Sequence, residues 1–164
     1  YGIETVEKKN KFKGQYYSNI NGFNSRLDEI QSTILNKKLK NVDTYIKKRK
    51  GLVKIYMNEL SSTSLKLPYE NPNCEHVYHL FTIYHSKAEL IMKKLLKKKV
   101  QTKVIYPYPI HKMKAYKYLS SNYKRLKNSE IKSRGIMCLP LYPELNKNEV
   151  KIICKKIKDI IKNI

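Results

Sequence analysis

The sequence has few acidic residues, few glycines and few cysteines, and it contains no tryptophan. Its 13 Asp and Glu stand against 35 Lys and Arg, which gives a formal net charge of +22. A hydrophobic share of 41% with 14 Tyr is nevertheless too apolar for a disordered basic tail. The length of 164 residues suits one domain, or one domain with an appended arm, and can bury a real core.

These shortages exclude several classes of protein. No apolar stretch approaches the roughly 18 residues that a membrane-spanning helix needs, so a membrane protein is excluded. The three cysteines form no CxxC pair, which gives no disulfide framework and is typical of a reducing compartment such as the cytoplasm. The chain has no phosphate-cradling glycine-rich loop, no nucleophile elbow and no HExxH motif. We therefore expect no self-sufficient active site.

The positive charge at first suggests a polyanionic partner such as nucleic acid. Only four of the basic residues are Arg, however, and planar bidentate contacts with phosphates and bases favour Arg over Lys. The lysines are also spread over nearly every segment. We favour a compositional bias with a solvated lysine-rich surface, and we do not expect nucleic acid as a partner. A basic nucleic-acid-binding module remains the alternative.

Hydrophobic spacing predicts an α/β or α+β unit with one small sheet. A loop-rich segment over residues 1–23 precedes a long helix that runs to about Leu60 and bends near Lys40-Asn41. Asn24 or Ser25 can cap this helix. The remaining predicted elements are strands at 76–84, 100–105 and 136–139, and helices at 87–99, 115–120, 129–134 and 147–163.

A cluster of possible metal ligands lies at Cys74, His76, His79 and His85. On a strand, His76 and His79 point to opposite faces, because their separation is an odd number of residues. His79 and His85 lie about 20 Å apart along an extended chain. The spacing therefore favours ordinary histidines at a strand edge, and we expect no metal site.

Two segments look too irregular for packing alone. Residues 22–29 place polar side chains with anion-binding potential at the positive end of a helix. Residues 106–111, Tyr-Pro-Tyr-Pro-Ile-His, present tyrosine hydroxyls and an imidazole on a backbone that two prolines stiffen.

These segments resemble motifs in the second half of the DegT-type aminotransferases, pyridoxal-phosphate enzymes that aminate keto groups on nucleotide-linked sugars. The matching segments are Asn24–Gln31 (NSRLDEIQ), Tyr106–His111 (YPYPIH) with Ala115-Tyr116, and Glu130 followed by Cys138–Leu145 (CLPLYPEL). The family has NSRLDEIQA, YPxPxH…AY and AE…SLPMYPEL, and His76–Phe81 resembles its VWHLY strand. Order and spacing agree over essentially all 164 residues.

The resemblance implies the C-terminal portion of an aspartate-aminotransferase-like (type I pyridoxal phosphate) fold. In this reading, residues 1–40 end the large domain and start the linking helix, and residues 41–164 form the small domain. The family's Schiff-base lysine lies upstream, so no catalytic residue is assigned to this chain. The first residues, Tyr1-Gly2-Ile3-Glu4, show neither a signal peptide nor a starting Met. We therefore expect a fragment, inactive by itself.

The resemblance also implies roles for four residues. Asn24 contacts the cofactor phosphate of the partner subunit in a homodimer, or simply caps its own helix. Arg26 lies near the same interface, where it contacts phosphate or pairs with a neighbouring carboxylate. Tyr106 and His111 face the sugar substrate or cofactor, or pack the loop. Ile105 stands where many members have His, so a substrate contact by that His is not expected here.

The implied activity is amination of a nucleotide-linked keto-sugar, with pyridoxal 5'-phosphate as cofactor and glutamate as amino donor. The implied setting is cytoplasmic synthesis of cell-surface polysaccharide or deoxyaminosugars. Besides the nucleic-acid-binding module, a non-catalytic relic or dimerisation module is the alternative.

Overall fold

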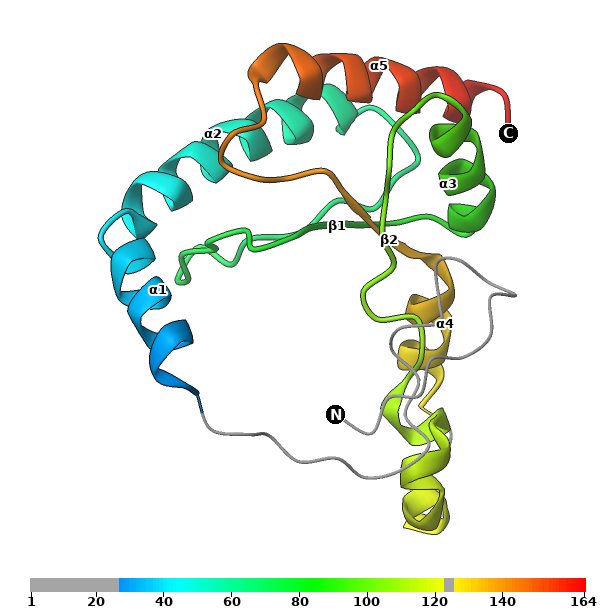
Figure 1. Cartoon of the computed structure of the whole chain (residues 1–164). Coiled ribbons are helices and arrows are strands. Elements are labelled where there is room, and N and C mark those ends of the chain that lie inside the picture. Colours follow the sequence, from blue (N-terminus) through cyan, green and yellow to red (C-terminus); the bar gives the residue numbers. More distant parts are fainter. Residues whose placement is uncertain (1–26, 123–125) are drawn as a thin grey trace.

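The computed structural model describes residues 27–122 and 126–164, and its helices surround one small sheet (Figure 1). The elements in chain order are α1 (Glu29–Leu39), α2 (Val42–Leu60), β1 (Phe81–Tyr84), α3 (Ala88–Lys97), the 3₁₀ helices η2 (Ile110–Lys112) and η3 (Lys114–Asn122), α4 (Lys127–Gly135), β2 (Ile136–Leu139) and α5 (Lys147–Lys162). This architecture confirms the predicted α/β class.

The sheet consists of β1 and β2, which pair antiparallel with Phe81 opposite Leu139 and Tyr84 opposite Ile136. Single bridges, Lys66 to Tyr84 and Lys103 to Cys138, lie at its margins. The predicted strand at 136–139 is confirmed, since β2 has the same bounds.

The other two strand predictions need correction. Only the last four residues of 76–84 form a strand, because Tyr78 has a left-handed backbone with φ of 49° that interrupts the extended chain. The segment 100–105 is not a strand. Lys103 exchanges both backbone hydrogen bonds with Cys138, whereas the Val100 N–H turns back to the Leu95 carbonyl at the end of α3, 2.9 Å away.

The core lies where α2, α3 and α5 pack on one side of the strand pair (Figure 1). Its largest fully buried side chains are Tyr56, Phe81, Leu60, Ile83, Ile91, Leu95, Met137 and Ile157. The Tyr56 ring stacks on Phe81 with centroids 4.9 Å apart, and its hydroxyl donates to the Pro140 carbonyl at 2.9 Å. Burying this large ring therefore leaves no polar atom of its side chain unpaired.

The predicted long helix is broken at the predicted place, between α1 and α2. Asp28, not Asn24 or Ser25, caps α1, because its carboxylate accepts the Gln31 N–H at 2.7 Å in the first turn. No residue of α1 is buried, and Ile30 is 74% exposed. Figure 1 shows α1 leading away from the core, so the apolar stripe that predicted this helix is buried only along α2.

The last helix, α5, closes the core and matches its prediction to within one residue at the C-terminal end. Asn146 and Glu149 form a capping box, in which each side chain bonds the other's backbone N–H at 2.9 and 3.0 Å. Val150, Ile153, Cys154, Ile157 and Ile160 are buried at helical spacing. This amphipathic face fixes α5 against α2 and α3.

Candidate functional site

A cavity of about 510 Å³ lies beside the Tyr106–His111 loop, between that loop and α4. Its lining includes Tyr106, Tyr108, Pro109, His111, Tyr116 and Lys132. The backbone of this loop is irregular between α3 and η2, as its two prolines predict. The structure thus brings Tyr106 and His111 together at one cavity.

His111 forms part of the cavity wall through a pair with α4. Its Nε2 lies 3.3 Å from Oε1 of Glu130, and the two side chains are only 14% and 11% exposed. The Lys112 ammonium lies 3.5 Å from the same carboxylate oxygen. Glu130 stands in the first turn of α4, where the helix dipole favours a negative charge. A charged network therefore joins the loop to the helix.

α4 is held tightly against the end of β1. The Lys132 ammonium lies 4.4 Å from the centroid of the Tyr84 ring, within the range of a cation–π contact. Gly135 ends the helix so close to Tyr84 that a Cβ there would meet a ring carbon at 2.3 Å. The His85 N–H also donates to the Gly135 carbonyl at 2.9 Å. These contacts fix the wall that carries Glu130.

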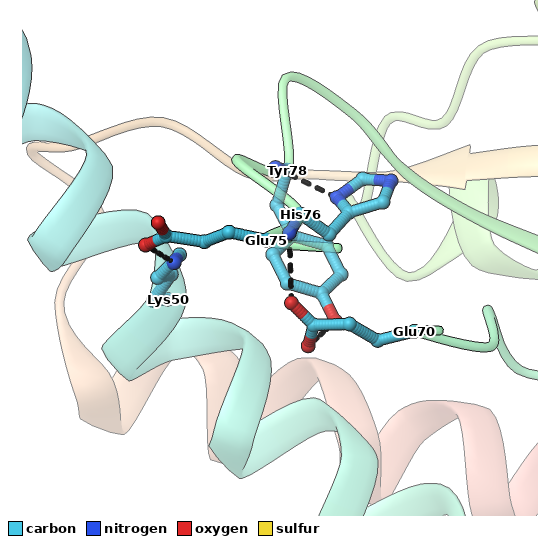
Figure 2. Close-up of polar contacts among 5 residues, drawn as sticks. All are labelled: Lys50, Glu70, Glu75, His76 and Tyr78. Carbon is cyan, nitrogen blue, oxygen red and sulfur yellow. Dashed lines mark hydrogen bonds and ion pairs between the residues drawn. The ribbon is translucent and has the colours of Figure 1, made fainter. Parts of the chain in front are cut away.

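A second polar cluster closes the loop before β1 (Figure 2). Glu70 accepts the His76 N–H at 2.8 Å and the Tyr78 hydroxyl at 3.0 Å, and these bonds hold its pKa below the ordinary value. The Tyr78 N–H donates to Nδ1 of His76 at 2.9 Å, and burial raises the pKa of the Tyr78 hydroxyl. Lys50 of α2 pairs with Glu75. These contacts connect segments of the same chain to one another, and we assign the cluster a structural role.

The buried cysteines are poor nucleophile candidates. Burial raises the pKa of Cys138, although its thiol also contacts the Thr82 hydroxyl at 3.3 Å. Burial likewise raises the pKa of Cys154 to about 12. Because the thiolate is the reactive species, both side chains belong to the core.

Two of the three histidines considered as metal ligands have other partners. Nδ1 of His76 bonds Tyr78, while His85 bonds the Lys87 N–H at 3.0 Å and the Ser64 hydroxyl at 3.2 Å. Cys74 and His79 are exposed. Across residues 27–122 and 126–164 there is no group of three or more His, Cys, Asp or Glu that could hold a metal ion. No helix in that part of the chain is long and apolar enough to cross a membrane.

Two predicted site residues, Asn24 and Arg26, lie outside the described residues. The structure adds Glu130 and Lys132, to which the sequence pattern assigned no role at the site. Glu130 belongs to one of the motifs that resemble the family, and that motif was the signal that could have identified it. Its contact with His111, which lies 19 residues away on a different helix, had no periodic signal in the sequence.

Comparison with known proteins finds one family and several similar aminotransferases. The profile of the DegT/DnrJ/EryC1/StrS aminotransferase family matches residues 2–158. The dTDP-3-amino-3,4,6-trideoxy-alpha-D-glucose transaminase of Micromonospora megalomicea subsp. nigra is 29% identical over 98% of this chain and 42% of its own length. The UDP-2-acetamido-2-deoxy-3-oxo-D-glucuronate aminotransferase of Pseudomonas aeruginosa is 30% identical over 81% of this chain and 36% of its own.

Solved structures agree on the fold. DesV of S. venezuelae, determined with a ketimine intermediate, superposes with a TM-score of 0.78 at 24% identity, over 99% of this chain and 43% of DesV. Helicobacter pylori PseC, an aminotransferase of pseudoaminic acid biosynthesis, gives 0.72 at 26% identity, over 98% of this chain and 44% of PseC. The chain thus spans about two fifths of the length of these relatives. By the match of the family profile over residues 2–158, the chain belongs to the DegT/DnrJ/EryC1/StrS aminotransferase family.

Proposed function

We infer that this chain supplies the small domain of a pyridoxal-phosphate-dependent aminotransferase that aminates a nucleotide-linked keto-sugar. Family membership supports this function, and relatives named for dTDP- and UDP-linked sugars support the substrate class. The observation that carries the proposal is the cavity where Tyr106 and His111, both in family motifs, lie together.

The proposed domain division assigns residues 1–40 to the end of the large domain and the start of the linking helix. Residues 41–164 then form the small domain. The contrast between α1, which buries no residue, and α2, which packs four residues into the core, supports a boundary at the break between them. An exposed apolar stripe on α1 is what a helix that packs on a large domain requires.

The described residues at the cavity do not form a cradle for pyridoxal phosphate. The Lys132 ammonium lies over the Tyr84 ring, and the Lys112 ammonium pairs with Glu130. The cofactor, which acts as an electron sink for amino transfer, is therefore assigned to residues beyond these. We propose that Asn24, with Arg26 beside it, contacts the phosphate of the partner subunit's cofactor in a homodimer.

The cavity suits the sugar end of the substrate. Tyr106, Tyr108 and Tyr116 offer flat aromatic faces for apolar contact, and His111 adds a polar group at the wall. We propose Tyr106 and His111 as substrate-binding residues, glutamate as the amino donor and the cytoplasm as the location.

Calorimetric titration of the chain with dTDP- and UDP-linked sugars tests this function. We expect binding that weakens about tenfold in Tyr106→Phe, which removes a hydroxyl, and in His111→Asn, whose shorter amide does not reach the position of the imidazole. Lys93→Ala is the matched control, because Lys93 pairs with Glu89 on the exposed face of α3, away from the cavity. Absence of sugar binding by the unaltered chain would contradict the proposal, as would equal affinity in all three variants.

Amino transfer from glutamate is the second measurement, made on the whole polypeptide in which this chain occurs. We expect keto-sugar amination that depends on added pyridoxal phosphate. A polypeptide that binds the cofactor but aminates none of the dTDP- or UDP-linked keto-sugars would exclude the proposed substrate class.

A further inference from the structure

The contact between His111 and Glu130 sets the chemistry of one wall of the cavity. His111 belongs to η2, directly after the proline-rich loop, and Glu130 belongs to α4. Their side chains approach to 3.3 Å while remaining 14% and 11% exposed. Two largely buried polar groups from separate elements are thus held against each other beside a cavity of about 510 Å³.

An ionised carboxylate can only accept hydrogen bonds, so the ring nitrogen that faces it must carry a proton. The nitrogen nearest Glu130 is Nε2, and a neutral imidazole protonated there has an unprotonated Nδ1. Within the described residues, Nδ1 of His111 has no hydrogen-bond partner. The Lys112 ammonium lies 3.5 Å from Oε1 of Glu130 and balances the charge of that carboxylate.

We propose that Glu130 is a positioning residue, which holds His111 in the Nε2–H tautomer so that Nδ1 accepts a hydrogen bond from a sugar hydroxyl in the cavity. The proposed contact between Nδ1 and a sugar hydroxyl rests on the proposed function. The proposed tautomer rests only on the geometry of His111 and Glu130. Glu130 acts through His111 and need not touch the substrate.

The tautomer is tested by NMR on the chain labelled with ¹⁵N-histidine. Four histidines give four sets of ring signals, and the set that disappears in His111→Asn is assigned to His111. Two-bond nitrogen–proton correlations then distinguish Nε2–H from Nδ1–H. We expect Nε2–H in the unaltered chain and a mixture of tautomers in Glu130→Gln, whose amide both donates and accepts. An Nδ1–H signal in the unaltered chain, or an unchanged signal in Glu130→Gln, would overturn the inference.

Two further variants separate positioning from simple support of the wall. Glu130→Asp keeps the charge but shortens the side chain, so it should lose the tautomer preference as Glu130→Gln does. Glu89→Gln is the matched control, since Glu89 also lies in the first turn of a helix, α3. We expect no change at His111 in this control. If Glu130→Asp retains the unaltered signal, charge without contact suffices and the positioning role is wrong.

The sugar contact is tested by titrating the same variants with dTDP- and UDP-linked sugars. Loss of one hydrogen bond predicts about tenfold weaker binding in Glu130→Gln and no change in Glu89→Gln. Unchanged affinity in Glu130→Gln, alongside weaker binding in Tyr106→Phe, would overturn the sugar contact while the proposed function stands. No sugar binding by the unaltered chain would overturn both, whereas the NMR result would still decide the tautomer.

Discussion

Two regions of the molecule are stabilised by different kinds of contact. In the core layer, formed by α2, α3, α5 and the strand pair, the largest side chains are less than 2% exposed and nearly all apolar. In the cavity wall, residues 106–122 and 126–135, Tyr106 is 62% exposed and Ile110 is 65% exposed. Polar contacts such as His111 with Glu130 hold that region instead.

This difference separates stability from recognition. Burial of apolar area contributes most to the free energy of folding, and here it lies mainly in the core layer. Exposed aromatic rings around a cavity contribute less to folding but remain available to a ligand. Substitutions in the core layer should therefore change stability most, while those in the cavity wall should change binding most.

Removing a buried side chain from α5 should have the largest effect on stability. Ile157 is 0% exposed, so Ile157→Ala should lower the free energy of unfolding by about 2–5 kcal/mol, through lost burial and the cavity left behind. Urea unfolding measures this. Ile152→Ala is the matched control on the same helix, because Ile152 is 53% exposed and its loss should cost no more than about 0.5 kcal/mol. Equal losses would contradict the packing described for α5.

The junction between the two regions gives the next largest effect. A Cβ at Gly135 would meet a Tyr84 ring carbon at 2.3 Å and the His85 carbonyl oxygen at 2.8 Å. Gly135→Ala should therefore destabilise the chain by about 1–3 kcal/mol and lower its Tm. Gly51→Ala should stabilise the chain by about 0.5–1 kcal/mol, because a Cβ at Gly51 would meet no neighbouring group within 4 Å and alanine favours the helix. Shifts of Tm in the same direction would refute the tight contact at Gly135.

Tyr56→Phe removes one buried hydrogen bond and keeps the ring on Phe81. The hydroxyl donates to the Pro140 carbonyl at 2.9 Å, so its loss should cost about 0.5–1.5 kcal/mol in urea unfolding. Tyr69→Phe, at a side chain that is 81% exposed, should leave the unfolding curve unchanged. A Tyr56→Phe curve that matches the unaltered chain would mean that water replaces the bond.

The same contrast explains how much of the fold the sequence predicted. α5 was predicted closely because its buried residues repeat at helical spacing and Asn146 with Glu149 marks its start. The bend predicted near Lys40-Asn41 lies where the chain breaks between α1 and α2. The strand at 76–84 was overextended, because Tyr78 adopts a left-handed backbone that no propensity indicates. Strand formation at 100–105 depended on pairing with β2, which a local pattern cannot fix.

The site was predictable only in part. Two prolines predicted an irregular loop that presents Tyr106 and His111, and both lie at the cavity. Their partners on α4 were not predictable, because a contact between two separate helices leaves no periodic trace in the sequence. The roles of Asn24 and Arg26 remain predictions, since they lie outside the described residues.

The smallest expected effect concerns Glu70, which fastens the loop before β1 (Figure 2). Bonds from the His76 N–H and the Tyr78 hydroxyl lower the pKa of this carboxyl in the folded chain. A carboxyl whose folded pKa is depressed stabilises the fold above its unfolded pKa, about 4.3, and loses that contribution as pH falls through the lower folded value. Stability should therefore decline below about pH 4.3, and Glu70→Gln should decline less. The effect is small because Glu70 is exposed to water.

Urea unfolding at a series of pH values from neutral to acid measures this decline in stability. The contribution of a second carboxyl, Glu59, must be distinguished from that of Glu70. Lys158 of α5 lowers the pKa of Glu59 on α2, so part of the acid sensitivity belongs to that pair. Glu59→Gln and Glu70→Gln should each remove a portion of the decline, and the portions should add because the two carboxyls share no partner. If Glu70→Gln declines as steeply as the unaltered chain, the loop before β1 is held by the pair of Lys50 with Glu75 and by burial of Tyr78, and Glu70 contributes little to its stability.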